Sequence, residues 1–314
     1  MKTRTIPGTD LRVSAVGLGG WALGGEHWGD DVDDDAARAA VHAALDVGIT
    51  LFDTAPLYGR GHADAILREA LGPRIREVVV ATKVGPRYEG DHPVSDLSPA
   101  NLRRDVEASL RRLGVEALDL AQIHWPCEVG TPLEASLEAL VALREEGKIR
   151  HLGLCNYGPE ALERARALAP IVTLQTPLSL IRREYEGGVS DAVARTGVGV
   201  LAYEPLARGL LTGKYRALPR FGPTDMRRRD PRFWAAGFSQ IAPTVERLRR
   251  AAAQLNTTPA ALAIAWAATR PGVLAALAGA KRPAQVRENA EAGRLLERPG
   301  ARALLDRVGD AVAR

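Results

Sequence analysis

Short apolar runs alternate with helix-periodic stretches along nearly the whole chain, and this alternation limits the fold more than any other feature. Runs such as VVVATKV and GVGVLAY are almost continuously apolar, which is typical of parallel strands covered on both faces. Stretches such as 33–48 and 98–114 between the runs have the apolar spacing of helices. The pattern predicts strands near residues 13–21, 50–55, 78–84, 117–125, 150–155, 171–176, 198–203 and 274–279.

Two α/β architectures fit this order of elements: a closed (β/α)₈ barrel and an open, doubly wound sheet. An open sheet that binds a dinucleotide usually carries a GxGxxG turn after its first strand and an acidic residue about 20 residues later. The segment GLGGWALGG (17–25) imitates that turn only loosely, and no clear acidic residue follows at the required distance. We therefore expect a TIM barrel over residues 1–314 as a single domain, opened by a short hairpin around the turn Pro7–Asp10.

One connection, residues 206–240, stands out by its length and its richness in proline, glycine and arginine. It follows the seventh predicted strand. Connections of this length without regular structure are usually functional loops or lids. We expect this to be the only large insertion in the barrel.

Composition excludes several classes of protein. The net charge of +4 arises from arginines spread over helices, which argues against a nucleic-acid surface. No apolar run reaches the roughly 18 to 20 residues that a membrane span needs. The two cysteines, Cys127 and Cys155, and the lack of a leader-like start indicate a cytoplasmic protein without a disulfide framework. The residues leave the oligomeric state open.

Four titratable side chains follow the second, third and fourth predicted strands. Asp53 and Lys83 close two of these strands, His124 closes the next, and Tyr58 lies five residues after Asp53. Because reactive groups of such barrels gather at the carboxyl ends of the strands, we expect the four to converge. A tyrosine donates a proton poorly at neutral pH unless a cation lowers its pKa, and Lys83 is placed to do so. Asp53 then holds Lys83, and His124 orients the substrate oxygen.

The stretches FDTAPLYG, ATKVG and QIHWP resemble the aldo-keto reductases, whose catalytic residues are Asp, Tyr, Lys and His in this order. The stretches HLGLCNYG, LQTPLSL, YEPLARGLLTGKY and GAKRPAQVRENAEAG are similar to the cofactor-binding parts of that family. The resemblance implies NADPH-dependent reduction of an aldehyde or ketone to an alcohol, with Tyr58 as the general acid and NADP⁺ as the oxidised cofactor.

The resemblance also implies which residues contact the cofactor and the substrate. Asn156 and Gln175 correspond to residues that bind the nicotinamide carboxamide, and Tyr203 to the residue that stacks on the ring. The other implied cofactor contacts are Trp21, Asp53, Pro205, Leu206, Gly209, Leu211, Lys214, Arg227 or Arg229, Gly279, Lys281, Arg282, Gln285, Glu288 and Asn289. The implied substrate contacts are Trp21, Tyr58, His124 and Trp125.

The adenosine end indicates which form of the cofactor binds. Lys281 and Arg282 stand at the start of a predicted helix, whose first amides and adjacent cations suit the 2′-phosphate of NADPH.

Two other functions remain open at this point. Metal-assisted hydrolysis needs several His and acidic ligands within reach of one another, and the six histidines show no such pairing. Potassium-channel β subunits share the reductase body and its four catalytic residues, and bind a cofactor as regulatory subunits; the short start of this chain shows no inactivation segment. Among substrates, Trp28, Tyr88 and Trp125 suit an aromatic and a sugar-like carbonyl equally, and the preferred direction of the reaction stays open. Cys155 and Cys127 depart from the family pattern outside the four catalytic positions.

Overall fold

Eight parallel strands close into a barrel in the computed structural model, which describes residues 1–28 and 33–313. Neighbours in the barrel follow the order of the chain, and the last strand pairs with the first to close it. The TIM-barrel prediction is therefore confirmed. The strands are β3 (Val16–Gly19), β4 (Leu51–Asp53), β5 (Val79–Val84), β8 (Leu118–Ile123), β9 (Ile149–Cys155), β10 (Ile171–Pro177), β11 (Gly199–Tyr203) and β12 (Val273–Gly279).

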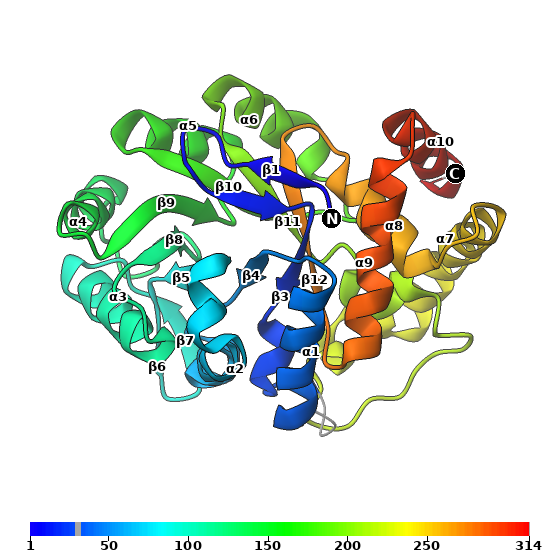
Figure 1. Ribbon diagram of the computed structural model, residues 1–314, viewed down its shortest axis with the longest axis horizontal. Helices are drawn as coiled ribbons and strands as arrows, with labels where there is room; N and C mark the ends of the chain where they lie inside the picture. The colour runs from blue at the N-terminus through cyan, green and yellow to red at the C-terminus, as the bar shows by residue number, and fades with distance from the viewer. Residues whose placement is uncertain (29–32, 314) are drawn as a thin grey trace.

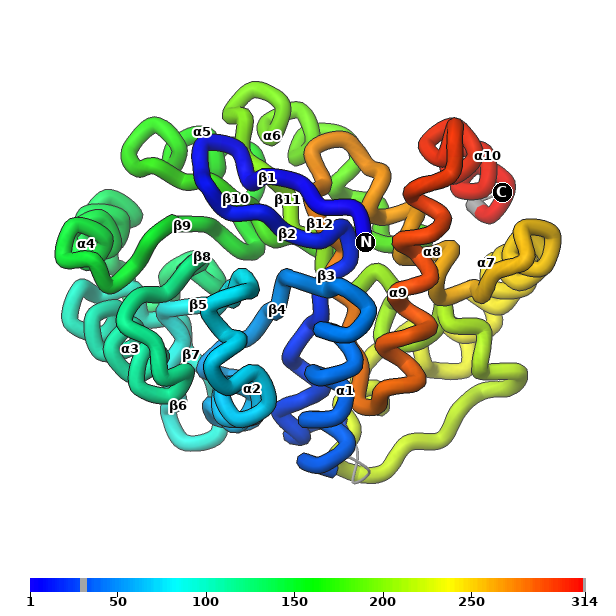
Figure 2. The backbone as a smooth tube through the Cα atoms, viewed as in Figure 1, coloured from blue at the N-terminus to red at the C-terminus, as the bar shows by residue number. Residues whose placement is uncertain are grey.

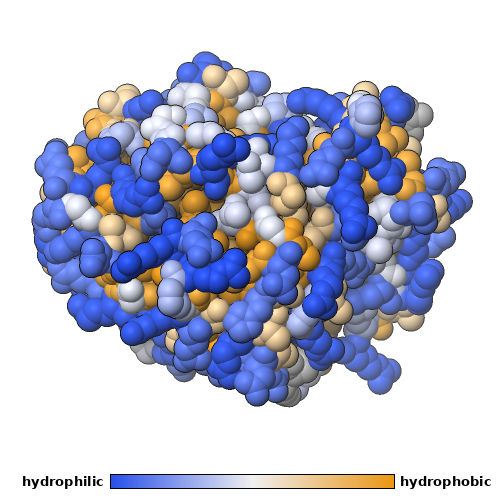
Figure 3. Space-filling view, in the orientation of Figure 1, coloured by the Kyte–Doolittle hydropathy of each residue, from blue (hydrophilic) through white to orange (hydrophobic). Residues whose placement is uncertain are grey.

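Helices surround the barrel, as Figure 1 shows. The first of them illustrates why they form: the Asp33 carboxylate accepts a hydrogen bond from the amide of Ala36 at 2.8 Å, and Gly48 follows the helix with φ +78°. Hydrophilic side chains cover most of the outer surfaces of the helices on the face seen in Figure 3. The helices are α1 (Asp34–Asp46), α2 (His62–Leu71), α3 (Pro99–Leu113), α4 (Leu133–Glu145), α5 (Pro159–Leu168), α6 (Ser190–Thr196), α7 (Ala235–Gln254), α8 (Pro259–Ala268), α9 (Pro283–Glu297) and α10 (Ala301–Ala313).

The apolar run 13–21 is divided between two sheets. Its first residues belong to β2 (Arg12–Ser14), which pairs with β1 (Thr3–Thr5) in the predicted amino-terminal hairpin. Barrel strand β3 starts only at Val16, and the Ser14 hydroxyl donates to the Val16 carbonyl at 2.6 Å where the chain turns. A polar side chain that bonds nearby backbone favours a turn over a continuous strand.

The hairpin closes one end of the barrel. Ile6 and Val13 are fully buried and pack in one apolar cluster with inward-facing barrel residues such as Leu51 and Leu201. Arg4 adds hydrogen bonds to the carbonyls of Val273 and Leu274, and Figure 2 shows the hairpin in dark blue beside β12. The opposite end of the barrel, at the carboxyl ends of the strands, remains open and carries the candidate active site.

Two connections at the carboxyl ends of the strands differ from expectation. The segment after β5 forms a second hairpin, β6 (Pro86–Glu89) and β7 (His92–Ser95), so 206–240 is not the only large insertion. The 206–240 segment itself contains short 3₁₀ turns at Ala207–Thr212, Met226–Arg229 and Pro231–Phe233, and helix α7 has already begun at Ala235. The described helices contain none that is both long and apolar enough to cross a bilayer.

The contribution of the amino-terminal hairpin, which plugs one end of the barrel, can be tested by measuring the stability of the whole protein. We expect Ile6→Ala to lower the free energy of unfolding by about 2–4 kcal/mol, because the deleted methyl groups lose burial and leave a cavity. Urea unfolding followed by circular dichroism measures this. Thr5→Ala, on the exposed side of the same hairpin, is the control and should change stability by less than about 0.5 kcal/mol. Equal, small effects of both substitutions would show that the plug contributes little.

Candidate active site

A buried ion pair lies at the centre of the site. Strands β4 and β5 are neighbours, and the Lys83 ammonium lies 2.6 Å from Asp53 Oδ1 and donates to the carbonyl of Thr54 at 3.0 Å. Lys83 is 1% exposed and Asp53 is 4% exposed. Buried charges persist only when they are paired and hydrogen-bonded, so each of these two residues fixes the other.

Tyr58 stands over this pair at the start of a tight turn. The turn is possible because Gly59 has φ +59° and passes so close to the carbonyl of Gly24 that a Cβ would clash with it. The Lys83 ammonium lies 5.0 Å from the centroid of the Tyr58 ring, and the Trp21 ring stacks on Tyr58 at a centroid distance of 6.2 Å. The turn therefore holds the phenol against the ion pair.

Burial raises the pKa of Tyr58 well above its ordinary value of 10, and the charge of Asp53 acts in the same direction. The expectation that Lys83 lowers this pKa is not met. The Lys83 charge is balanced by Asp53 at 2.6 Å, so little of its field is left to stabilise a phenolate. The proton of Tyr58 therefore stays on its oxygen at neutral pH.

His124 completes the four predicted residues. Its ring lies 6.2 Å from the Tyr58 ring and stacks on Trp125 at 4.1 Å. Burial, followed by the nearby Lys83 cation, lowers the pKa of His124 well below its ordinary 6.5. The imidazole is thus neutral at physiological pH, with one nitrogen that donates and one that accepts.

The ends of β9, β10 and β11 bring three implied cofactor residues to the ion pair. Gln175 donates to Asp53 Oδ1 at 2.7 Å, and Asn156 donates to the carbonyl of His124 at 3.0 Å. The Tyr203 hydroxyl donates to the Asn156 side chain at 2.7 Å. Asn156 has φ +64°, a conformation that asparagine tolerates better than most residues. The side-chain amides of Asn156 and Gln175 are therefore held in one orientation.

The two cysteines lie in different surroundings. Cys155 lines the cavity, and its thiol donates to Gln175 Oε1 at 3.5 Å. Burial raises the pKa of Cys155 to about 12, so the thiol is protonated and unreactive at neutral pH. Cys127 is only partly buried and is not part of the cavity wall.

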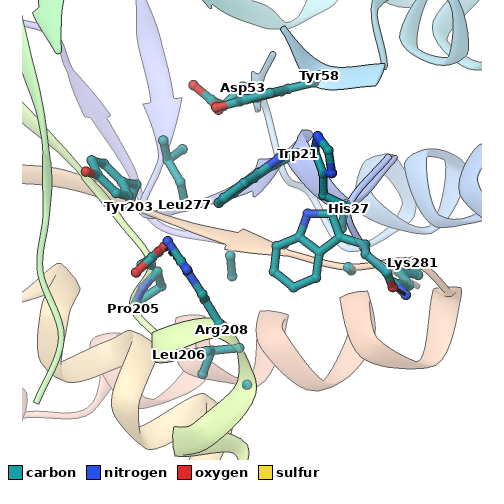
Figure 4. Close-up of a pocket in the computed structure, with 18 of the residues that line it drawn as sticks. Trp21, His27, Asp53, Tyr58, Tyr203, Pro205, Leu206, Arg208, Leu277 and Lys281 are labelled. Carbon is teal, nitrogen blue, oxygen red and sulfur yellow. Dashed lines mark hydrogen bonds and ion pairs between the residues drawn. The ribbon is translucent and has the colours of Figure 1, made fainter. Parts of the chain in front are cut away.

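One cavity of about 870 Å³ joins these residues to the start of α9. In Figure 4, Trp21 lies between Tyr203 on one side and Lys281 on the other, with Asp53 and Tyr58 above it. The predicted residues that line the cavity are Trp21, Asp53, Tyr58, His124, Trp125, Asn156, Gln175, Tyr203, Pro205, Leu206, Gly209, Lys214, Arg227, Gly279, Lys281, Arg282, Gln285, Glu288 and Asn289.

Three of the named residues do not line the cavity wall. Lys83 is buried behind the wall, paired with Asp53 and close to the Tyr58 ring. Leu211 is fully buried in the hydrophobic core and does not line the cavity. Of the two arginines considered, Arg227 lines the cavity and Arg229 does not.

The sequence analysis named Pro205, Leu206 and Gly209 but not their neighbours Glu204, Ala207 and Arg208, of which Glu204 and Arg208 line the cavity. Glu204, Ala207 and Arg208 have φ values of +54°, +47° and +56°, which are unfavourable for residues with a Cβ and cluster at functional sites. Arg208 donates to Glu204 at 2.7 Å, and its guanidinium lies 5.5 Å from the Trp21 ring centroid. Their residue types gave no indication of a functional role. Only their position within YEPLARGLL, a stretch similar to a cofactor-binding part of the family, could have pointed to them.

The remote end of the cavity fits the phosphates of a dinucleotide. Helix α9 starts after Arg282, whose side chain makes no capping hydrogen bond, and the Lys281 amide donates to Gln285 at 2.8 Å. Amides at a helix start, with Lys281, Arg282 and Arg227 on the same wall, form an anion-binding end. At the other end of the cavity lie the aromatic ring of Tyr203, on which a nicotinamide ring can stack, and the side-chain amides of Asn156 and Gln175. The residues present therefore fit a nicotinamide dinucleotide.

Metal ligands are a separate question. Across residues 1–28 and 33–313, no group of three or more His, Cys, Asp or Glu side chains is arranged to hold a metal ion. This leaves metal-assisted hydrolysis without a candidate ligand set in that part of the chain.

Sequence relatives cover most of the chain. The model of the aldo/keto reductase family matches residues 15–298. The aldo-keto reductase YhdN of Bacillus subtilis is 36% identical over 290 residues, which cover 91% of this chain and 87% of that protein. The NADH-specific methylglyoxal reductase of Escherichia coli is 32% identical over 306 residues, which cover 93% of each.

Solved structures agree with the sequence relatives. The glycerol dehydrogenase AKR11B4 from Gluconobacter oxydans superposes with a TM-score of 0.87 at 37% identity, covering 99% of this chain and 96% of its own. The aldo-keto reductase AKR11C1 from Bacillus halodurans superposes with a TM-score of 0.78 at 27% identity, covering 98% and 96%. By its family match and these relatives, the chain belongs to the aldo/keto reductase family.

Proposed function

We propose that this oxidoreductase uses NADPH to reduce aldehydes or ketones to alcohols, with Tyr58 as the proton donor. The observation that carries the proposal is the arrangement of Tyr58 and His124 over the buried pair of Asp53 and Lys83. These groups lie at one end of a cavity whose other end gathers cations at the start of α9. A screen of aldehydes, ketosteroids, quinones and aldoses with NADPH tests it directly.

The four residues divide the work of carbonyl reduction. The nicotinamide, when bound, supplies a hydride to the carbonyl carbon. His124, neutral because of its burial, donates a hydrogen bond that orients the carbonyl oxygen and stabilises charge as it develops there. The raised pKa of Tyr58 keeps its proton in place until that oxygen becomes basic, and the phenol then transfers it. Lys83 balances the charge of Asp53 and so limits the unfavourable effect of that carboxylate on the phenolate that remains.

Two relatives support a small oxygenated substrate, because one is named for methylglyoxal and the other for glycerol. The aromatic wall of Trp21, Trp28 and Trp125 offers faces on which a short carbon chain or a ring can pack. A regulatory subunit that resembles potassium-channel β subunits would keep the same four residues and bind the same cofactor. Turnover, and not cofactor binding, separates these two functions.

The first prediction concerns the acid. Tyr58→Phe should lower the rate of carbonyl reduction by roughly 10²- to 10⁴-fold, because the proton donor is lost while the ring remains. NADPH affinity, measured by quenching of tryptophan fluorescence, should stay close to that of the wild type. The control is Tyr88→Phe, at the rim of the same cavity, which should keep most of the rate. A control at Phe52 would not serve, because Phe52 is buried in the core. A rate within a few-fold of wild type in Tyr58→Phe would refute the assignment.

The second prediction concerns pH. Because the pKa of Tyr58 is raised above 10 and that of His124 is lowered below 6.5, neither residue changes protonation between about pH 7 and 9. We expect kcat/KM for reduction, at saturating NADPH, to be level over this range. Lys83→Met leaves Asp53 unbalanced, so it should reduce the rate and move the basic limb to still higher pH. A wild-type inflection near pH 6.5, or an unchanged limb in a Lys83→Met enzyme that still turns over, would contradict these roles.

The third prediction concerns cofactor choice, on which the relatives differ because one of them is NADH-specific. Neutralising Lys281 and Arg282 together should weaken NADPH binding about tenfold or more and barely change NADH binding, since a charge-assisted contact is worth about 1.5–3 kcal/mol. Titration of both cofactors by fluorescence quenching measures the two losses. Equal losses would mean that these residues hold the shared pyrophosphate or the fold, and the 2′-phosphate assignment would be dropped.

A further inference from the structure

The hairpin of β6 and β7 forms one wall of the cavity beside the candidate acid. Tyr88, Asp91 and Pro93 of this hairpin line the cavity. The Tyr88 hydroxyl donates to the carbonyl of Leu57, the residue before Tyr58, at 3.4 Å. A substrate that extends beyond the carbonyl group will therefore meet this hairpin.

The Asn101 side chain of helix α3 binds both ends of the hairpin base. The Asn101 amide nitrogen donates to the carbonyl of Gly85 at 2.7 Å and to the carbonyl of Asp96 at 2.6 Å, and these two residues flank the hairpin. Arg104 donates to the Asn101 side-chain oxygen, so both the nitrogen and the oxygen of the Asn101 side chain are hydrogen-bonded. Asn101 is 3% exposed. It therefore ties both ends of the hairpin to α3 from a buried position.

A second residue of α3 holds the same point. The Asp105 carboxylate accepts a hydrogen bond from the amide of Gly85 at 2.8 Å. Gly85 has φ +112°, and a Cβ there would overlap the Leu97 side chain, so only glycine fits this position. Asn101 and Asp105 thus bind the carbonyl and the amide of one glycine, where the barrel strand β5 turns into the hairpin.

The outer strand of the hairpin is connected to the segment that carries Trp125. The Ser95 hydroxyl donates to the Trp125 carbonyl at 3.1 Å, and the Ser95 amide donates to Glu128 at 2.6 Å. A displacement of the hairpin would therefore also move Trp125, which lines the cavity. The contacts at the tip are weaker. The ion pair between Arg60 and Asp91 is largely exposed, with side-chain exposures of 48% and 94%, and such pairs contribute little.

We propose that Asn101, supported by Asp105, is a positioning residue that fixes the hairpin wall and thereby determines how well the cavity binds a large substrate. The proposal rests on the proposed carbonyl reduction. Neither residue lines the cavity, so both act through the hairpin. An isolated two-stranded hairpin is at best marginally stable. Its position therefore depends on what holds it, and buried hydrogen bonds in surroundings of low polarity hold more strongly than exposed ion pairs.

The test compares a bulky aromatic aldehyde with methylglyoxal. In Asn101→Ala we expect KM for the bulky aldehyde to rise about tenfold, the effect of about 1.4 kcal/mol of lost contact, because the displaced wall no longer packs on the ring. For methylglyoxal, which is too short to depend on the wall, kcat and KM should stay within about twofold. The dissociation constant of NADPH should not change.

Ser109→Ala is the matched control. Ser109 is a fully buried polar residue of α3, two turns beyond Asn101, and it is bonded to Arg112 and not to the hairpin. It should reproduce any general loss of stability while leaving the ratio of the two KM values unchanged. Asp105→Asn keeps an oxygen that accepts from Gly85 and should keep the ratio, whereas Asp105→Ala should shift it in the direction of Asn101→Ala. The Asp105 variants also supply the answer if Asn101→Ala does not fold.

Hydrogen exchange of residues 86–95 separates this proposal from the proposed function. Exchange in this segment should rise in Asn101→Ala and not in Ser109→Ala, whether or not the protein reduces carbonyls. If the wild type reduces no carbonyl, the proposed function fails, and affinity for the aromatic aldehyde, read by tryptophan quenching, replaces KM. Unchanged exchange in a folded Asn101→Ala protein, or an unchanged ratio of the KM values or aldehyde affinities, overturns the positioning role.

Discussion

The ion pair of Asp53 and Lys83 is the interaction on which the site depends. Both charges are buried, and two charges can be taken out of water only if they meet at close range with their remaining hydrogen bonds satisfied. The Thr54 carbonyl and the Gln175 amide supply those hydrogen bonds. Three neighbouring features follow from this pair: the register of β4 against β5, the orientation of Gln175, and the place at which Tyr58 can rest.

Burial and the same pair together set the electrostatics of the neighbouring groups. Burial is the largest cause of both pKa shifts and moves the pKa values of Tyr58 and His124 in opposite directions; the Asp53 charge adds to the rise for Tyr58, and the Lys83 charge adds to the fall for His124. Both groups are neutral as a result. A neutral phenol and a neutral imidazole at one cavity wall can each donate a hydrogen bond to a carbonyl oxygen, which a phenolate could not do. The strained residues around Pro205 and the hairpin held by α3 form further parts of the same cavity wall.

Much of the site was predictable because barrel geometry converts sequence position into location. Residues that end parallel strands meet at one end of a barrel, so Asp53, Lys83 and His124 could be brought together from their places in the sequence alone. The resemblance to a known family extended this to residues of the cofactor groove, most of which line the cavity. Leu211 was an exception, because the turn at Ala207–Thr212 directs it into the core. The hairpin after β5 was also not predicted: its strands are four residues each and form only because each has the other to pair with.

The sequence by itself determined the order of strands and helices, the (β/α)₈ class, and the identity of the ion pair and of Tyr58 and His124 beside it. These properties follow from local periodicity and from which residues end each strand, and both can be read along the chain. Tertiary structure decided the direction of the Tyr58 pKa, the wall formed by the second hairpin and the role of Asn101 in holding it. Each of these depends on burial or on hydrogen bonds between residues of different elements, and no pattern within one segment encodes a contact made by another.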